Sequence, residues 1–254
     1  MSAKAKKLVE ECAAEKHKTL DLVDRSISNI IDLPGFLNLQ HVTSITLAHN
    51  KLSSLPASIA NLVNLEVLNL FNNQLEELPT SLSSMPCLKQ VLDLTYNNLN
   101  EKSLPGNFCQ LETLRALYMA DNDFEYLPTE IGQLQNLQIL VLRDNELVAL
   151  PKEIGDLIRL RELHIQGNRL TVLPPEFANL DLMGTKNVFK YEGNPWAPPI
   201  MEQLKKGLAN MFDYIKSDTY KYLYGRRIAA DAPPPPRSHD KSKKASRKGM
   251  KAKS

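Results

Sequence analysis

The sequence has few cysteines and lacks the features that mark secreted and membrane-spanning chains. Its three cysteines, Cys12, Cys87 and Cys109, are scattered, so they predict neither a disulfide framework nor a Cys-x-x-Cys metal site. The opening segment, MSAKAKKLVEECAAEKH, holds no apolar core of the roughly 7–15 residues that a signal peptide needs. No apolar run approaches the roughly 18 residues of a membrane-spanning helix. These absences predict a reduced, intracellular compartment.

Motifs for catalysis and cofactor binding are lacking too. The chain has no phosphate-binding loop, no Gly-x-Gly-x-x-Gly and no His-Glu-x-x-His. Cys109 has no basic neighbour in sequence that would lower its pKa, so we interpret it as a bystander. Sequence alone leaves a Ser/His/Asp site open, but no pattern points to one. The histidines, which show no metal-ligand spacing, are His17, His41, His49, His164 and His239. We therefore expect no enzymatic activity, no cofactor, no metal ion and no small-molecule substrate.

What the sequence does contain is a repeat with the pattern L-x-x-L-x-L-x-x-N-x-L. The Asn of this pattern recurs along the chain at steps of 23, 24, 25, 23 and 23 residues. Most copies continue with a Leu-Pro pair, as at Leu78-Pro79 and Leu150-Pro151. Six copies in phase indicate a leucine-rich repeat. The copies are 42–52, 65–75, a displaced copy around Asn97, 114–124, 137–147 and 160–170.

This repeat predicts an α/β solenoid with a parallel, concave sheet. Each copy begins with a short strand, in which alternate leucines such as Leu68 and Leu70 point inward. The chain then returns on the outer side as a helical or 3₁₀ segment such as 154–157. Strands of successive copies pair in parallel and curve.

The Asn of each copy is expected to be structural. Where a strand turns, backbone N–H and C=O groups point inward and lose their sheet partners, yet buried backbone groups must be paired. An Asn amide has both donors and an acceptor, so a stack of Asn side chains joins one turn to the next. The predicted ladder consists of Asn50, Asn73, Asn97, Asn122, Asn145, Asn168 and Asn194.

Both ends of the solenoid need a cap, because a terminal core would otherwise face water. We predict an N-terminal helical cap over residues 1–19 and the solenoid over residues 20–196, with Arg25 in the Asn position of the first turn. Trp196 is interpreted as a core residue of the C-terminal cap. Residues 197–228 are expected to form a C-terminal capping helix from about Pro199 to Tyr224. The apolar residues expected to close the core are Met201, Leu204, Leu208, Met211, Phe212 and Ile215.

The last residues, 229–254, are Pro-rich and basic, and they lack the apolar residues needed to fold. The formal charge of +2 divides into +7 for residues 237–254 and −5 for the rest of the chain. The run KSKKASRK could bind nucleic acid, anionic lipid or an import receptor. We favour the alternative, a solvated tail that keeps the protein soluble. Nucleic-acid binding is the weaker interpretation, and it would depend on this tail.

The residues between the inward leucines face out on the concave side. An apolar and aromatic strip rimmed by acids is unusual for a surface without a partner, although strand propensity also favours Tyr, Val and Ile. Aromatic centres with charged rims are typical of protein interfaces. We therefore predict a partner site here. Its members are Asn69, Phe71, Asp93, Tyr96, Tyr118, Asp121, Val141, Arg143 and Asp144, and the exposed strip consists of Phe71, Tyr96, Tyr118, Ile139 and Val141.

Several segments resemble the Ras suppressor protein family. They include DRSISNIIDLPGF, DLTYNNLNEKSLPGNF and LHIQGNRLTVLPPE, and the more specific cap segments NPWAPPI and SDTYKYLYGRR. The similarity runs essentially from end to end. It implies a non-enzymatic, monomeric adaptor in the cytoplasm and at focal adhesions, with a nuclear pool left open by the basic tail. The implied partner is the last LIM domain of the PINCH adaptor, and through it integrin-linked kinase and parvin, with effects on integrin and Ras-linked signalling.

One copy departs from the family pattern. In LKQVLDLTYNNL the step from Leu88 to Leu92 is four residues where the neighbouring copies use three. Members of the family carry one more full repeat at this point, so Gln90-Val91 is interpreted as a seam left by a missing repeat, through alternative splicing or a gap in the gene model. A solenoid tolerates such a loss because each repeat contacts only its neighbours.

A different use of the same concave face stays open. The chain could regulate a small GTPase or a phosphatase directly. The two interpretations differ in what the binding depends on. Binding of a LIM domain depends on its zinc, whereas binding of a GTPase depends on its bound nucleotide.

Overall fold

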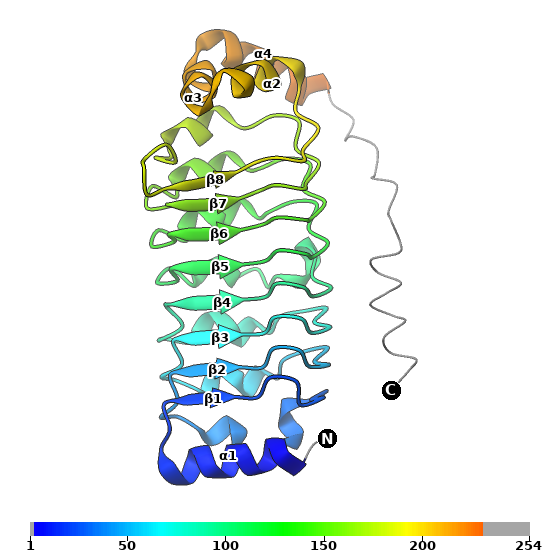
Figure 1. Cartoon of the computed structure of the whole chain (residues 1–254), viewed down its shortest axis with the longest axis vertical. Coiled ribbons are helices and arrows are strands. Elements are labelled where there is room, and N and C mark those ends of the chain that lie inside the picture. Colours follow the sequence, from blue (N-terminus) through cyan, green and yellow to red (C-terminus); the bar gives the residue numbers. More distant parts are fainter. Residues whose placement is uncertain (1–2, 231–254) are drawn as a thin grey trace.

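The structure, a computed structural model, describes residues 3–230 and consists of one parallel sheet with a cap at each end (Figure 1). The strands follow one another in sequence order, so each pairs with the next copy of the repeat. They are β1 (Thr19–Asp21), β2 (Ser44–Thr46), β3 (Val67–Asn69), β4 (Val91–Asp93), β5 (Ala116–Tyr118), β6 (Ile139–Val141), β7 (Glu162–His164) and β8 (Val188–Lys190). The predicted fold class, an α/β leucine-rich repeat solenoid, is confirmed.

The core lies between the sheet and the outer segments. The middle residue of every strand points inward, and these residues are in register from Leu20 through Leu68 and Leu140 to Phe189. Each is buried, because period-two alternation sends it away from solvent. Burial of each such side chain contributes about 1.5–3 kcal/mol relative to exposure, so the repeated leucines supply most of the driving force.

On the outer side the chain returns in short 3₁₀ helices. A proline such as Pro79 or Pro151 sits directly before most of them, with φ near −70° and ψ near 150°. Proline fixes φ and has no N–H to leave unpaired, so it ends the extended turn at this point. The 3₁₀ helices are Ile30–Asp32, Phe36–Asn38, Ala57–Asn61, Thr80–Ser84, Glu101–Ser103, Phe108–Gln110, Thr129–Gln133, Lys152–Asp156 and Pro175–Asn179.

The out-of-step copy is accommodated just before β4. Before most other strands two successive N–H groups share one carbonyl, as Gln138 N and Ile139 N both donate to Arg115 O. At the seam the corresponding bonds are divided, since Arg115 N donates to Lys89 O and Ala116 N donates to Gln90 O, both at 3.0 Å. The extra residue therefore forms a bulge, and β4 remains in register with both neighbours.

The two additional residues of the same copy form a turn of their own. Residues 101–103 make a 3₁₀ helix capped by Asn100, whose side chain accepts a hydrogen bond from Lys102 N at 2.9 Å. Ser103 Oγ accepts from Asn100 N at 3.0 Å and donates to Glu76 O in the preceding copy. This reciprocal capping arrangement satisfies the backbone where the Leu-Pro pair is delayed.

The N-terminal end is covered by α1 (Ala3–Glu15). Its buried residues are Ala5, Val9 and Cys12, which share one face of a helix. Figure 1 shows α1 lying across the end of the solenoid beside β1.

The C-terminal cap is helical, but the prediction of one continuous helix was wrong. The structure has α2 (Pro198–Lys206), α3 (Leu208–Lys216) and α4 (Asp218–Ala230). Gly207 separates the first two with φ of 121°, a region that side chains rarely adopt, and Ser217 with ψ of 148° separates the others. Of the residues predicted to close the core, Met211, Phe212 and Ile215 are buried, Leu204 and Leu208 are half-buried, and Met201 is 37 % exposed.

Other cap residues pack as the sequence predicts. Trp196 is buried, and its Nε1 donates to Tyr191 O at 3.0 Å. Tyr220 of α4 accepts a hydrogen bond from Leu173 N at 3.2 Å and donates to Leu173 O. Since α4 extends to Ala230, the predicted tail overlaps it by two residues, and the remainder, 231–254, lies outside the described residues.

The packing of successive 3₁₀ helices leaves no room for a side chain at Gly155. A Cβ at this position would come within 2.2 Å of Glu176 O in the next copy. We expect Gly155→Ala to lower the free energy of unfolding by about 1–3 kcal/mol, because the backbone of the neighbouring copy has to shift. Gly106→Ala is the control, since its Cβ would meet no atom within 4 Å. Urea unfolding followed by circular dichroism measures both, and equal midpoints would contradict the prediction.

Candidate functional site

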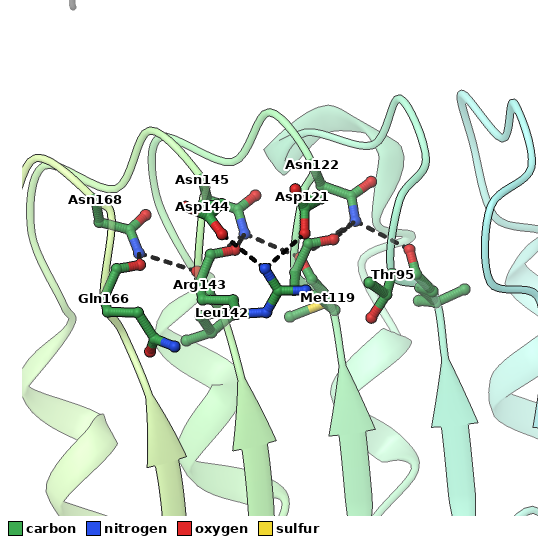
Figure 2. A network of polar contacts seen from close by, with 12 residues as sticks. Thr95, Met119, Asp121, Asn122, Leu142, Arg143, Asp144, Asn145, Gln166 and Asn168 are labelled. Carbon is green, nitrogen blue, oxygen red and sulfur yellow. Dashed lines mark hydrogen bonds and ion pairs between the residues drawn. The ribbon is translucent and has the colours of Figure 1, made fainter. Parts of the chain in front are cut away.

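The concave face is held in shape by the Asn ladder at the ends of the strands. Asn145 illustrates the pattern: Nδ2 donates to Met119 O of the preceding copy at 2.9 Å and to Leu142 O of its own at 3.0 Å. Its Oδ1 accepts from Phe124 N at 3.2 Å. Asn50, Asn73, Asn97, Asn122, Asn168 and Asn194 make the equivalent bonds. Figure 2 shows Asn122, Asn145 and Asn168 in line.

Directly before the Asn position lies a row of left-handed residues, which sequence reasoning missed. Every copy has positive φ at this point, because the chain reverses curvature there to present the Asn side chain inward. Asn, Asp and Gly adopt this region most readily, and their recurrence before the ladder is the signal that identifies it. The row is Asp24, His49, Asn72, Tyr96, Asp121, Asp144, Gly167 and Gly193.

The third residue of each strand forms the central row of the concave face. Asp93 on β4 is paired in register with Tyr118 on β5, followed by Val141 on β6 and His164 on β7. Asp93, Tyr118 and His164 are half-buried. The predicted exposure of Val141 was wrong, since it is 6 % exposed between the larger Tyr118 and His164. Val141 therefore forms the floor of the strip.

Asp93 also has a structural task. Its Oδ1 accepts a hydrogen bond from Thr95 N at 2.9 Å, which turns the chain at the end of β4. Asn69 makes the same bond to Phe71 N, and Asp21 makes it to Val23 N, each at 2.9 Å. Burial raises the pKa of the Asp93 carboxyl, and the bonds to Thr95 oppose this rise. Asp93 is thus a carboxylate held in place and only partly solvated.

Two acidic groups influence Tyr118. Burial raises the pKa of its hydroxyl, and the charges of Glu162 and Asp93 raise it further. Glu162 Oε1 lies 2.9 Å from His164 Nε2. Burial lowers the pKa of His164 in spite of Glu162, and Lys190 and Arg143 also lower it, so the imidazole is neutral at pH 7. The ring at the centre of the strip therefore has Asp93 on the adjacent strand and feels the charge of Glu162 from two strands away.

The rim at the ends of β5 and β6 contains an ion-pair network. Arg143 Nη1 lies 3.0 Å from Asp121 Oδ2 and 2.7 Å from Asp144 Oδ2 (Figure 2). The three predicted site residues are thus brought together, but the guanidinium partly neutralises both carboxylates. Because Arg143 is about 39 % exposed, these pairs contribute little to stability.

An aromatic cluster lies at the ends of β2–β4. The ring of Phe71 is 5.0 Å from that of His49 and 6.1 Å from that of Tyr96, measured between centroids. Asn72 Nδ2 lies 2.7 Å from His49 Nδ1. Asn69 adjoins the cluster on β3, so the structure gathers the predicted residues into an aromatic part and an acidic part of one surface. Sequence reasoning did not include His49, although its place before Asn50 is equivalent to that of Tyr96 before Asn97.

The described residues offer no second kind of site. No group of three or more His, Cys, Asp or Glu side chains in residues 3–230 is arranged to hold a metal ion. Burial, together with the charge of Glu130, raises the pKa of Cys109 to about 12, so its thiol is not ionised at neutral pH. Within the same part of the chain, no helix combines the length and apolarity needed to span a membrane.

The raised pKa of Asp93 predicts a pH-dependent stability difference. A carboxyl whose pKa is higher in the folded than in the unfolded state destabilises the fold above the folded pKa, and this penalty vanishes as pH falls to the unfolded value. Asn69 shows that an amide makes the same turn bond. We expect Asp93→Asn to be at least as stable as wild type at pH 7, with any advantage lost below about pH 4. Urea unfolding at both pH values tests this, and a less stable variant at pH 7 would refute it.

Comparisons with known proteins agree with this architecture. Residues 81–206 match the model of a leucine-rich repeat region, and residues 40–84 match that of leucine-rich repeats in two copies. Among solved structures, a leucine-rich repeat protein of Leptospira interrogans is 33 % identical with a TM-score of 0.58, covering 76 % of this chain and 53 % of its own. A TDR receptor is 29 % identical with a TM-score of 0.54, covering 62 % of this chain and 28 % of its own.

Three animal proteins match over the whole length. Ras suppressor protein 1 of Homo sapiens and of Bos taurus are each 56 % identical to this chain, and that of Mus musculus is 55 % identical. Each alignment covers 100 % of this chain and 99 % of the relative. It extends over 275 positions, so at least 21 positions have no residue among the 254 of this chain, close to the length of one repeat. The chain therefore belongs to the Ras suppressor protein family of leucine-rich repeat proteins.

Proposed function

We propose that this chain is a non-enzymatic adaptor that binds the last LIM domain of a PINCH adaptor through its concave face. Through that domain it joins integrin-linked kinase and parvin at focal adhesions, and it modulates integrin and Ras-linked signalling from the cytoplasm as a monomer. The proposal is supported by the end-to-end similarity to Ras suppressor protein 1. Leucine-rich repeats are protein-interaction modules as a class, and their curved sheets serve as binding surfaces.

The observation that carries the proposal is the pairing of Asp93 with Tyr118 at the centre of the strip. A half-buried ring beside a carboxylate suits a Lys or Arg side chain, which gains from both the ring face and the charge. LIM domains often present such side chains. Floor residues such as Ala116 and Val141 are buried and leave the ring and the acids as the groups a partner meets.

The test is calorimetry of the full chain with the isolated LIM domain. We expect binding to the zinc-loaded domain and none to the same domain after zinc removal, because the domain folds only with its metal. Equal heats from both preparations, or no heat from either, would count against the proposal.

A second candidate function is favoured by the name of the relatives. A protein named as a Ras suppressor could bind a small GTPase, or a phosphatase, directly through the same face. This alternative predicts that a GTPase loaded with a triphosphate analogue is bound more tightly than its diphosphate form. Titration of both forms in the calorimeter distinguishes it from the LIM proposal.

The seam predicts weakened partner binding. One strand fewer brings Phe71 about one strand spacing, roughly 5 Å, closer to Asp93 than in a chain with the additional repeat. A partner shaped to the longer strip cannot contact both the aromatic and the acidic part. We expect insertion of one family repeat between Gln90 and Val91 to increase the affinity for the LIM domain. The control inserts the same repeat between Arg161 and Glu162, which restores the length but not the order, and equal affinities for both insertions would contradict the seam model.

A further inference from the structure

The loops at one edge of the sheet are acidic. These loops run from the end of each strand to the next helix, and together with the short 3₁₀ helix Glu101–Ser103 they contain ten acidic and five basic side chains. The acids are Asp24, Glu76, Glu77, Glu101, Asp121, Asp123, Glu125, Asp144, Glu146 and Glu192, and the bases are Arg25, Lys51, Lys102, Arg143 and Arg169. The net charge of these loops is −5, which equals the formal charge of residues 1–236 as a whole.

The acidity is concentrated after β5 and β6. These two loops hold Asp121, Asp123, Glu125, Asp144 and Glu146 against the single base Arg143. Within this group Glu125 and Asp144 are exposed, and the other three acids are half-buried. We call these five acids and Arg143 the acidic loops. Neighbouring negative charges raise the local concentration of a positively charged segment.

The chain itself contains a segment of the opposite sign, and the last described residue before it lies near this edge. Helix α4 ends at Ala230 on the side of the molecule toward which the strands point, above their C-terminal ends (Figure 1). Residues 237–254 follow with a formal charge of +7. The seven-residue stretch KSKKASR at 241–247 contains Lys241, Lys243, Lys244 and Arg247.

The connecting segment is long enough. Ten residues separate Ala230 from Lys241, and an extended chain spans about 3.3 Å per residue, or roughly 33 Å. The acidic loops lie two to three strand spacings from β8, which is about 10–14 Å, plus one layer of cap helix of about 10 Å. The run from Lys241 onward can therefore extend over both loops of its own molecule.

We propose that residues 237–254 bind the acidic loops of the same chain. Asp121 and Asp144 belong both to these loops and to the proposed partner site. The tail consequently competes with a cationic partner for the same carboxylates and lowers the affinity of the chain for that partner. This competition rests on the proposed function, whereas the binding of the tail to the acidic loops is independent of it.

Carbodiimide cross-linking of the full chain tests the tail contact without any partner. The reagent joins Lys ammonium groups to carboxylates in direct contact, and mass spectrometry identifies the joined residues. We expect cross-links from Lys243 and Lys244 to Glu125, Asp144 and Glu146. The convex face is the internal comparison, since it has an acidic hollow of its own lined by Glu112, Glu130, Glu153 and Asp156. We expect at least fivefold fewer cross-links from the tail to that hollow.

Two double variants sharpen the result. Asp123→Lys with Glu125→Lys should reduce the cross-links to Asp144 and Glu146 severalfold, whereas Glu130→Lys with Glu153→Lys should leave them unchanged. Raising the salt from about 0.05 M to about 0.5 M should also reduce them severalfold, because ionic screening shortens the range of the attraction. A mixture of ¹⁴N- and ¹⁵N-labelled protein shows whether the joined residues belong to one molecule.

Equal cross-linking to both acidic surfaces, or cross-links that join the two isotopes, would overturn the proposal. The effect on the partner is measured separately. Deletion of residues 237–254 leaves every described residue in place and should raise the affinity for the LIM domain severalfold at low salt. If the LIM domain does not bind either form, the adaptor proposal fails while the cross-link map still decides the tail contact.

Discussion

Asn145→Leu is expected to lower the free energy of unfolding by roughly 2–5 kcal/mol. The side chain is 2 % exposed and bonds four backbone groups. Leucine has a similar volume but no polar atoms, so the change removes hydrogen bonds without opening a large cavity. Phe124 N then loses the amide oxygen as its acceptor. The loss at the carbonyls is smaller, because Met119 O and Leu142 O each keep a second donor, Asn122 and Asn168 respectively.

This overlap explains why the expected loss in free energy of unfolding is smaller than the sum for four backbone groups left without a hydrogen-bond partner. Each inward carbonyl is shared by two successive Asn side chains, so the ladder loses one member without losing every bond around it. The matched control is Asn98→Leu, which makes the same chemical change at an exposed residue two copies away. We expect its stability to lie within about 0.5 kcal/mol of wild type. Urea unfolding by circular dichroism measures both variants, and an Asn145→Leu curve that coincides with the Asn98→Leu curve would show that the ladder is not what holds the strand ends.

The repeat could be predicted from sequence because its chemistry is periodic. Leu68, Leu92 and Leu117 recur at the same place in the pattern, and the solenoid has only one inward direction for them. The same reasoning identified the Asn positions, since a buried backbone needs a side chain with both donors and an acceptor. Register survived the seam because the bulge at Lys89-Gln90 lies before the strand and not within it.

The details of the concave face depend on neighbours that sequence does not bring together. The burial of Val141 follows from the heights of Tyr118 and His164 on adjacent strands, which are 23 residues away on each side. Arg143 was expected among the partner-contacting residues, yet its position between Asp121 and Asp144 depends on its rotamer. The division of the C-terminal cap was more accessible, because Gly207 interrupts the apolar periodicity and is the residue type that ends a helix with positive φ.

Asp93→Arg is expected to weaken binding of the LIM domain by about 2–5 kcal/mol, a loss of about 30-fold or more in affinity. The carboxylate is half-buried beside Tyr118, so a partner's cation placed there is largely removed from solvent, where a charge reversal is most costly. Arginine would both repel that cation and cover the ring. The substitution also removes the bond from Asp93 Oδ1 to Thr95 N, and an effect on folding therefore has to be separated from an effect on the interface.

Two controls make that separation. Asp21→Arg removes the equivalent turn bond, to Val23 N at 2.9 Å, from an exposed residue on β1 at the far end of the sheet. It should match Asp93→Arg in the loss of turn stability and bind the LIM domain like wild type. Asp93→Asn keeps the turn bond and removes only the charge, so its affinity should fall between those of wild type and Asp93→Arg. Calorimetry with each variant measures the affinities, and thermal unfolding confirms that each is folded. If Asp93→Arg binds as tightly as Asp21→Arg, the partner site lies elsewhere, on the convex side or on the C-terminal helices.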